Sequence, residues 1–365
     1  MDKLAKDRKD ELEKISKQLE DGIKNVYQSE RYKDYLTTMS KFHKYSYRNS
    51  LLIMMQNPAA TCVAGYKAWQ KNFNRNVKKG EKGIQILAPT PVHVEKEMDK
   101  LDPDTGKPIL DSDGNKVKEV VDVIIPRFKP VYVFDIAQTE GEPLPQLANE
   151  LKGNIREYDD FITALKSVSP FKVEFEDIRN GSKGYCSPIQ HKIAIKEGMS
   201  QIQTVKTMIH EITHADLHVD NELRIADGAE RRTEEVEAES VAFIVCSHYG
   251  IDTSDYSFGY IAAWSSNKEL EELGRSLASI QKQSSDLIDR IDAKLLELNR
   301  QRENEDMVKF DNDIDRDKEK NHKQLGYPDA IENRIAAAHE TAIHRNELRS
   351  GKSKTHELKQ QRGER

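Results

Sequence analysis

Apolar residues recur three and four positions apart over long stretches of this chain, which is the spacing of an amphipathic helix. The pattern predicts a helix over residues 1–30, which could continue to 46. Further helices are predicted over residues 47–56, 63–73, 158–168, 205–218 and 233–246. From Leu270 to Leu298 the same spacing gives one long helix with a narrow apolar seam and one skipped step at Ser284. Such a seam suits either packing on a domain or a short coiled coil.

Shorter apolar or alternating segments, bounded by turn residues, predict strands. They lie at residues 84–87, 120–125, 130–136, 171–175 and 185–195. Residues 99–118 contain two turn signals, DPDTG and DSDGN. The second resembles the start of a calcium-binding loop, but Lys116 and Asp122 occupy the positions where an EF-hand needs glycine and glutamate. We therefore interpret it as a hairpin turn.

The segment QTEGEPLP at residues 138–145 is the best candidate for a linker, and 365 residues are enough for two domains with extensions. We expect an α+β fold with a domain of mixed helices and strands at the N-terminus. The expected parts span 1–140, a second domain over 150–265, a long helix over 266–300 and a charged, partly disordered tail over 301–365. Within the tail, residues 328–347 could form an isolated helix.

The clearest chemical signal is the pentapeptide HEITH. His210 and His214 are four residues apart, so both rings project from one face of a helix and can bind one metal ion. Glu211 lies between them and can act as a general base, as in zinc-dependent hydrolases that usually cleave peptide bonds. The pentapeptide also occurs by chance in charged helices. An apolar stripe indicates instead a packed helix, through Val205, Met208, Ile209 and Ile212.

A third metal ligand is predicted in the next helix, over residues 233–246. Glu235 and Glu239 share a face with Ala238 and Ala242, and small residues let this helix approach the first one closely. A carboxylate in such a place is costly unless it is paired or metal-bound. We choose Glu235 as the ligand and keep Glu239 in reserve. A His/His/Glu set leaves a fourth position for water, as in catalytic zinc sites. The alternative is that these glutamates form a solvated face.

Residues 31–82 carry 11 lysines and arginines and only two acids, in a chain whose net charge is −6. Eight aromatic residues are interleaved with these cations. Cations that contact phosphates and rings that stack on bases are the usual means of binding single-stranded nucleic acid. The candidate DNA-binding residues are Arg48, Lys67, Trp69, Lys71, Arg75, Lys78, Lys79 and Lys82. Alternatively, the aromatic residues belong to the core and the cations to a solvated face.

The remaining composition points to a cytoplasmic protein. The three cysteines, at positions 62, 186 and 246, lie far apart and show no metal-binding or disulfide spacing, so we expect reduced thiols. The first residues are charged throughout and do not resemble a secretory signal. No apolar run approaches the length of a membrane span, so no membrane partner is expected.

The first half resembles the single-stranded-DNA-binding domain of ArdC-like antirestriction proteins, which occur on plasmids and conjugative elements. The resemblance lies in YSYRNSLLIMMQNP at 45–58, VAGYKAW at 63–69, VKKGEKGI at 77–84, LAP at 87–89 and VYVFDI at 131–136. The second half resembles a zincin-type metallopeptidase domain, and more distantly the ImmA/IrrE and SprT-like metallopeptidases. That likeness lies in GYCSP at 184–188, HEITH at 210–214 and EEVEAE at 234–239.

The resemblance implies that His210, His214 and Glu235 bind zinc, that Glu211 is the general base, and that the protein protects incoming DNA from restriction during conjugative transfer. One departure is that Ala215-Asp-Leu stands where family members often have a Trp-Thr-Gly-like stretch, which affects expected substrate contacts but not the metal site. Tyr185 is a candidate oxyanion stabiliser. The expected partners are single-stranded DNA and possible protein substrates, such as a restriction protein. The alternatives are a DNA-binding shield with a non-catalytic structural zinc, and a protease that acts on DNA-bound proteins.

Overall fold

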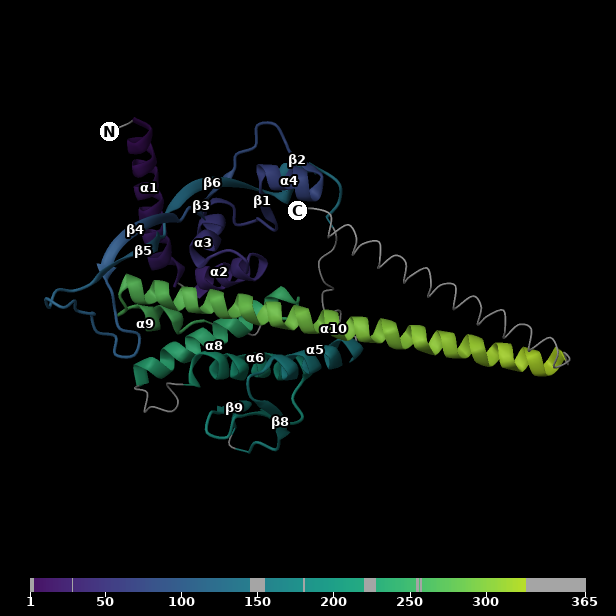
Figure 1. Cartoon of the computed structure of the whole chain (residues 1–365). Coiled ribbons are helices and arrows are strands. Elements are labelled where there is room, and N and C mark those ends of the chain that lie inside the picture. The colour runs from purple at the N-terminus through teal and green to yellow at the C-terminus, as the bar shows by residue number, and fades with distance from the viewer. Residues whose placement is uncertain are drawn as a thin grey trace. The chain divides into compact units, whose positions relative to one another are not determined.

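A computed structural model of the chain describes residues 3–325 except 28, 145–154, 180, 220–227, 254, 255 and 257. It divides into two units, Met1–Leu296 and Glu297–Arg365, each considered by itself. The helix expected over 328–347 and the end of the charged tail lie outside the described residues. Helices and strands together make a mixed α+β structure, as expected (Figure 1).

Four helices lie in the first part of the chain: α1 (Lys3–Val26), α2 (Ser29–Lys41), α3 (Tyr47–Gln56) and α4 (Tyr66–Phe73). The predicted helix over 1–46 is therefore divided in two near Tyr27. Helix α3 begins where the Ser46 side chain accepts a hydrogen bond from the Asn49 backbone N–H, and it ends before Pro58. The helix expected over 63–73 begins only at Tyr66, because its first three residues pair as a strand instead.

A three-stranded antiparallel sheet follows, with the order β1 (Val63–Gly65), β6 (Phe128–Asp135) and β3 (Ile84–Pro89). Its inner face packs on α3 in a small core of apolar residues: Phe42, Ile53, Ala60, Val63, Ile84, Ile86 and Val133. Because side chains alternate along a strand, Phe128, Tyr132 and Phe134 lie on the other face. Phe128 and Tyr132 are exposed.

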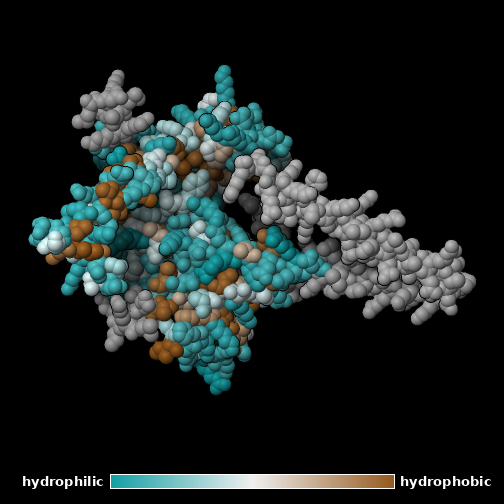
Figure 2. Space-filling model, viewed as in Figure 1, coloured by the Kyte–Doolittle hydropathy of each residue, from teal (hydrophilic) through white to brown (hydrophobic). Residues whose placement is uncertain are grey.

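Two smaller strand pairs complete this part, β4 (Val92–Asp99) with β5 (Lys118–Ile125) and β2 (Arg75–Val77) with β7 (Thr139–Gly141). The β4–β5 hairpin leaves apolar side chains in solvent (Figure 2), among them Met98, Leu101, Leu110, Val120 and Ile124. Its turn confirms the interpretation of DSDGN, because the Asp111 side chain accepts from the backbone N–H groups of Asp113 and Asn115. The expected linker, by contrast, starts with an ordered strand, β7.

The second part of the chain has a three-stranded sheet in the order β8 (Lys172–Glu176), β10 (Lys192–Lys196) and β9 (Gly184–Ser187). Strand β10 is parallel to β8 and antiparallel to β9. The helices are α5 (Ile155–Val168), α6 (Gln201–Leu217), α8 (Gly228–His248), α9 (Ile261–Ser265) and α10 (Leu270–Leu325). The segment predicted as a strand or hairpin arm over 185–195 is a hairpin of β9 and β10.

Both parts of the first unit share one core, and the apolar seam of α10 packs into it instead of forming a coiled coil. Tyr32 of α2 hydrogen-bonds Ser240 of α8 at 2.8 Å, and the Tyr27 hydroxyl donates to the Leu273 carbonyl at 2.9 Å. The buried seam residues are Leu273, Leu277, Ile280, Leu287, Ile288 and Ile291, with Ser284 buried among them. The seam packs on the domain over these residues. Among the described helices, none combines the length and apolar character that crossing a membrane requires.

Candidate metal centre

Helix α6 presents its two histidines to α8 because its other side is fixed in the core. The Ser200 side chain caps the helix by accepting from the Gln203 backbone N–H at 3.2 Å. The predicted apolar stripe is buried: Val205, Met208, Ile209 and Ile212. Strands β9 and β10 pack on α6, and so does α8. The HEITH segment is thus a packed helix, as the periodicity predicts.

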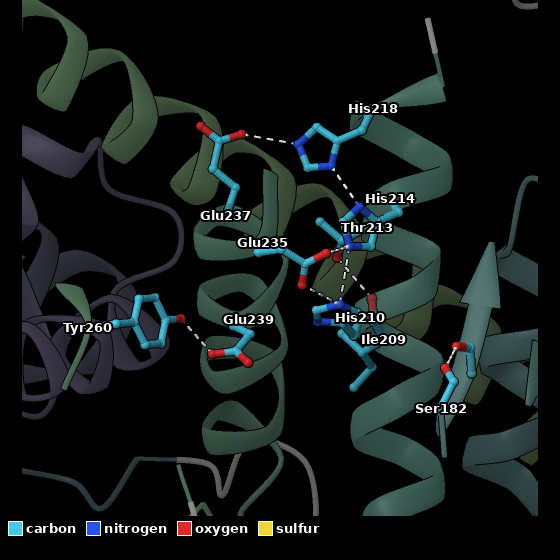
Figure 3. A network of polar contacts seen from close by, with 11 residues as sticks. Ser182, Ile209, His210, Thr213, His214, His218, Glu235, Glu237, Glu239 and Tyr260 are labelled. Carbon is cyan, nitrogen blue, oxygen red and sulfur yellow. Dashed lines mark hydrogen bonds and ion pairs between the residues drawn. The ribbon is translucent and has the colours of Figure 1, made fainter. Parts of the chain in front are cut away.

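Helix α8 approaches α6 through small residues and carries the acidic group of the site. Ala238 and Ala242 are buried, and Glu235 reaches both histidines (Figure 3). The Nε2 atoms of His210 and His214 lie 3.1 Å apart. The Glu235 carboxylate oxygens lie 3.4 Å from Nε2 of His210 and 3.5 Å from Nε2 of His214. The structure therefore brings together the three residues that the sequence suggested as ligands.

These distances fit one metal ion. Atoms that bind a tetrahedral zinc ion at about 2.0–2.2 Å lie about 3.3–3.6 Å from one another. Here the three donor atoms all lie within 4.8 Å of one another, and the closest pairs are at 3.1, 3.4 and 3.5 Å. Two imidazoles and one carboxylate are also a usual donor set for Zn²⁺. Three protein ligands leave a coordination position for water or substrate.

The electrostatics of the cluster favour a positive charge at its centre. Burial and the neighbouring His210 lower the pKa of His214 to about 3, so this ring is neutral near pH 7, the form that binds metals. Burial alone would lower the pKa of His210, but the hydrogen bond to Glu235 and nearby carboxylates outweigh it and raise that pKa. The same hydrogen bond with His210 lowers the pKa of Glu235.

A cavity of about 550 Å³ opens beside the donor atoms. Its lining includes Glu211, which is only 8% exposed, together with Glu239 and the backbone segment that leads into β9. At the start of that strand, a Cβ atom on Gly184 would lie 2.7 Å from Cγ2 of Thr207 and 3.2 Å from Cγ of Glu211. The strand can lie this close to the HEITH helix only because residue 184 has no side chain.

We expect Gly184→Ala to push β9 away from α6 and to displace Glu211. Overpacking of this kind costs about 1–3 kcal/mol in the free energy of unfolding. Thermal denaturation of the metal-free protein measures it, with Gly65→Ala as the control, because no atom lies within 4 Å of a Cβ placed there. Equal losses of stability in the two variants would contradict the close packing of β9 on α6 at Gly184.

Tyr185, the predicted oxyanion stabiliser, lies on β9 but is not among the residues that line this cavity. Its hydroxyl donates to Glu176 at 3.0 Å. Two tyrosines that the sequence did not suggest either line the cavity or contact a residue that lines it. Tyr256 lines the cavity, and the Tyr260 hydroxyl donates to Glu239 at 2.6 Å. Both follow α8 by a short segment with no recognisable motif, so only the tertiary structure reveals them.

Two of the eight predicted DNA-binding residues are structural. Trp69 is 0% exposed, and its indole N–H donates to the Phe134 carbonyl at 2.8 Å. Arg75 is 9% exposed and donates to the side chain and the carbonyl of Thr139, at 2.8 and 3.1 Å. It joins β2 to β7, which is why the expected linker starts with a strand. Neither side chain presents itself to a ligand in this structure.

The other six predicted residues are exposed cations, and Arg48 lies apart from the five lysines. Arg48 stacks on Tyr47 and borders a separate cavity of about 1310 Å³ that Arg127 and Phe128 also line. The remaining five lie on α4 and in the turn after β2: Lys67, Lys71, Lys78, Lys79 and Lys82. Helix α4 packs on β2, so these lysines belong to neighbouring elements.

Exposed aromatic rings lie next to these lysines. Tyr66, at the start of α4, is 56% exposed, and Tyr132 of β6 is 54% exposed. The ring centroids of Tyr66 and Phe134 are 6.2 Å apart. A Cβ atom on Gly83, the residue after Lys82, would lie 2.9 Å from Cβ of Tyr132 and 3.1 Å from Phe134. The alternation along β6 was the signal that could have identified Tyr132 in the sequence.

Comparison with known proteins assigns the first part of the chain. Residues 6–134 match the family model described as the N-terminal domain of anti-restriction factor ArdC. The match begins in α1 and ends in β6, so it includes the sheet, α4 and the exposed lysines. Residues 6–134 are therefore similar to the N-terminal domain of ArdC.

Similar chains cover more of the sequence. An uncharacterised protein of Bacillus anthracis is 29% identical over 324 residues, which are 81% of this chain and 54% of that protein. The DNA primase TraC of Escherichia coli is 29% identical over 233 residues, 60% of this chain and 15% of the primase. This chain thus spans about half of the first relative and a small part of the second. The metal-free crystal structure of antirestriction protein ArdC from plasmid R388 is 18% identical, with a TM-score of 0.42 over 68% of this chain and 85% of that one. Its Mn(II)-bound form has a TM-score of 0.41.

Proposed function

We propose that this chain is a plasmid-type antirestriction protein that binds single-stranded DNA through residues 1–140 and has a zinc-dependent metallopeptidase site of the zincin type in residues 150–265. The observation that carries the second part is the convergence of His210, His214 and Glu235 beside a cavity of about 550 Å³, which Glu211 also lines. The match of residues 6–134 to the ArdC N-terminal domain supports the first part.

The residues of the site have separate tasks in this proposal. The two imidazoles and Glu235 hold the ion, and a zinc ion there would supply Lewis acidity. Glu211 lines the cavity one residue from His210 and takes a proton from the attacking water as a general base. Tyr260 holds the Glu239 carboxylate by a hydrogen bond, which keeps this second acid away from the donor atoms. A substrate peptide would bind beside β9, which is an edge strand, because the cavity is lined by this strand's first residue and the segment before it: Gly181, Ser182, Lys183 and Gly184.

Metal content tests the proposal. We expect about one zinc per chain in the wild-type protein after purification with zinc supplied, and less than a tenth of that in His210→Ala. Glu235→Ala is expected to lower zinc affinity by more than about 10- to 100-fold, because it removes a ligand itself and loss of a ligand's hydrogen-bond partner alone typically costs that much. The measurement is elemental analysis after dialysis. Glu174→Ala is the control, since Glu174 of β8 pairs with Lys172 and Lys192 and does not line the cavity.

The alternatives give different results. Zinc that is retained by Glu235→Ala and lost only on substitution of Glu239 would move the third ligand to Glu239. No zinc in the wild-type protein would refute the metal site and leave a DNA-binding shield. A structural zinc without hydrolysis, or cleavage only of proteins bound to DNA, is distinguished by the Glu211 variant described below.

A further inference from the structure

His218, four residues beyond His214, closes the α6 helix at its C-cap and is 4% exposed. Its Nδ1 atom lies 3.1 Å from Nδ1 of His214, and its Nε2 atom lies 3.2 Å from a carboxylate oxygen of Glu237 (Figure 3). The Glu237 side chain is 12% exposed. A continuous chain of contacts therefore runs from a buried carboxylate on α8, through His218, to the ring that carries a proposed metal ligand atom.

The chemistry of these groups fixes which atom donates in each of the two hydrogen bonds. An ionised carboxylate only accepts hydrogen bonds, so the Nε2 atom of His218 donates to Glu237. In a neutral imidazole the other nitrogen then accepts, so Nδ1 of His218 accepts from Nδ1–H of His214. This fixes the proton of His214 on Nδ1 and leaves a lone pair on Nε2. That lone pair points at the site shared with His210 and Glu235.

The opposite donor and acceptor roles in the hydrogen bond between His218 and His214 are incompatible with metal binding. If His218 donated from Nδ1, His214 would accept at Nδ1 and would have to carry its own proton on Nε2, where a ligand needs its lone pair. We propose that Glu237 and His218 are positioning residues that set the tautomer and the ring orientation of His214. The inference rests on the metal site proposed above. Histidine ligands usually need such a partner, and its loss typically lowers metal affinity 10- to 100-fold.

The first test is the zinc dissociation constant, measured by competition with a chromophoric chelator. We expect His218→Phe, which fills the same space without an acceptor, to raise the constant about 10- to 100-fold. His218→Asn places an amide oxygen near the position of Nδ1 and is expected to recover part of the affinity. Glu237 and His218 both act on the metal site through the hydrogen bond between His218 and His214. The double variant His218→Phe with Glu237→Gln should therefore bind zinc no more weakly than His218→Phe alone.

The control is His248→Phe, a change of the same kind at the end of α8. His248 contacts the Ser40 carbonyl and the His43 ring and does not touch the site. We expect it to lower the unfolding temperature but not the zinc affinity. A second readout is the nitrogen-detected tautomer of His214 in the zinc-loaded protein, expected as Nδ1–H in wild type. Unchanged zinc affinity in His218→Phe, with tight binding in wild type, would overturn the positioning role alone. A wild-type protein that binds no zinc would overturn both proposals.

Discussion

The Glu211→Gln variant is expected to keep its zinc and lose its hydrolytic activity. Glutamine has nearly the same shape as glutamate, so the packing against Gly184 is retained, but an amide cannot take a proton from water. Loss of a general base typically slows a reaction about 100- to 10,000-fold. The measurement combines zinc content with hydrolysis of a fluorescent peptide library and with survival of unmodified DNA that enters a restricting host.

Glu197→Gln is the matched control, because Glu197 is exposed and follows strand β10 outside the site. It should behave as wild type in all three assays. If Glu211→Gln protects DNA fully, the peptidase mechanism is wrong and the protein acts as a shield with a structural zinc. If the wild-type protein cleaves only proteins bound to DNA, and Glu211→Gln loses that activity, the substrates are DNA-bound proteins.

Replacing Lys67, Lys79 and Lys82 with alanine is expected to weaken binding of a single-stranded oligonucleotide and to reduce its dependence on salt. For single strands the logarithm of the binding constant falls with the logarithm of salt by about 0.7 per phosphate contacted. Three lost contacts should therefore reduce the slope by about 2. Tyr66→Ala and Tyr132→Ala should each weaken binding roughly 5- to 100-fold without changing this slope, because base stacking is worth about 1–3 kcal/mol.

The control replaces Lys96, Lys100 and Lys107, exposed lysines of the β4–β5 hairpin, which removes the same charge from the same domain. Affinity and salt slope should then stay close to wild type. Equal effects of the two triple variants would mean that the net charge of the domain, and not this surface, governs binding. Trp69 is left intact, because its replacement would leave a cavity in the core and weaken binding by destabilising the domain.

Local sequence predicted the elements of the site well. The spacing of the two histidines and the apolar stripe of α6 depend only on the period of one helix, and the structure has that helix. The face of α8 that bears Glu235 follows from the same rule. The long seam of α10 was equally visible, but the choice between a coiled coil and packing on the domain needed the partner surface.

The proposed DNA-binding surface was harder to predict, because charge and aromatic character do not show whether a residue is buried. Trp69 and Tyr66 stand three residues apart on one short helix, yet one is in the core and the other in solvent. Arg75 looked like part of a basic run, but it donates hydrogen bonds to the carbonyl groups of Thr139 and Gly141, in a strand more than sixty residues away in sequence. Such long-range partners have no local signature.

The sequence by itself determined which side chains share a helix face, and so it determined the pair of histidines, the glutamate between them that we propose as general base, and the acidic helix that follows. Only the tertiary structure decided which of five glutamates on α8 meets the histidines, because that depends on how two packed helices are rotated about their axes. It alone paired His218 with Glu237, 19 residues apart, and separated Tyr185 from the cavity. Periodicity fixes faces within an element, whereas distances between elements come from packing.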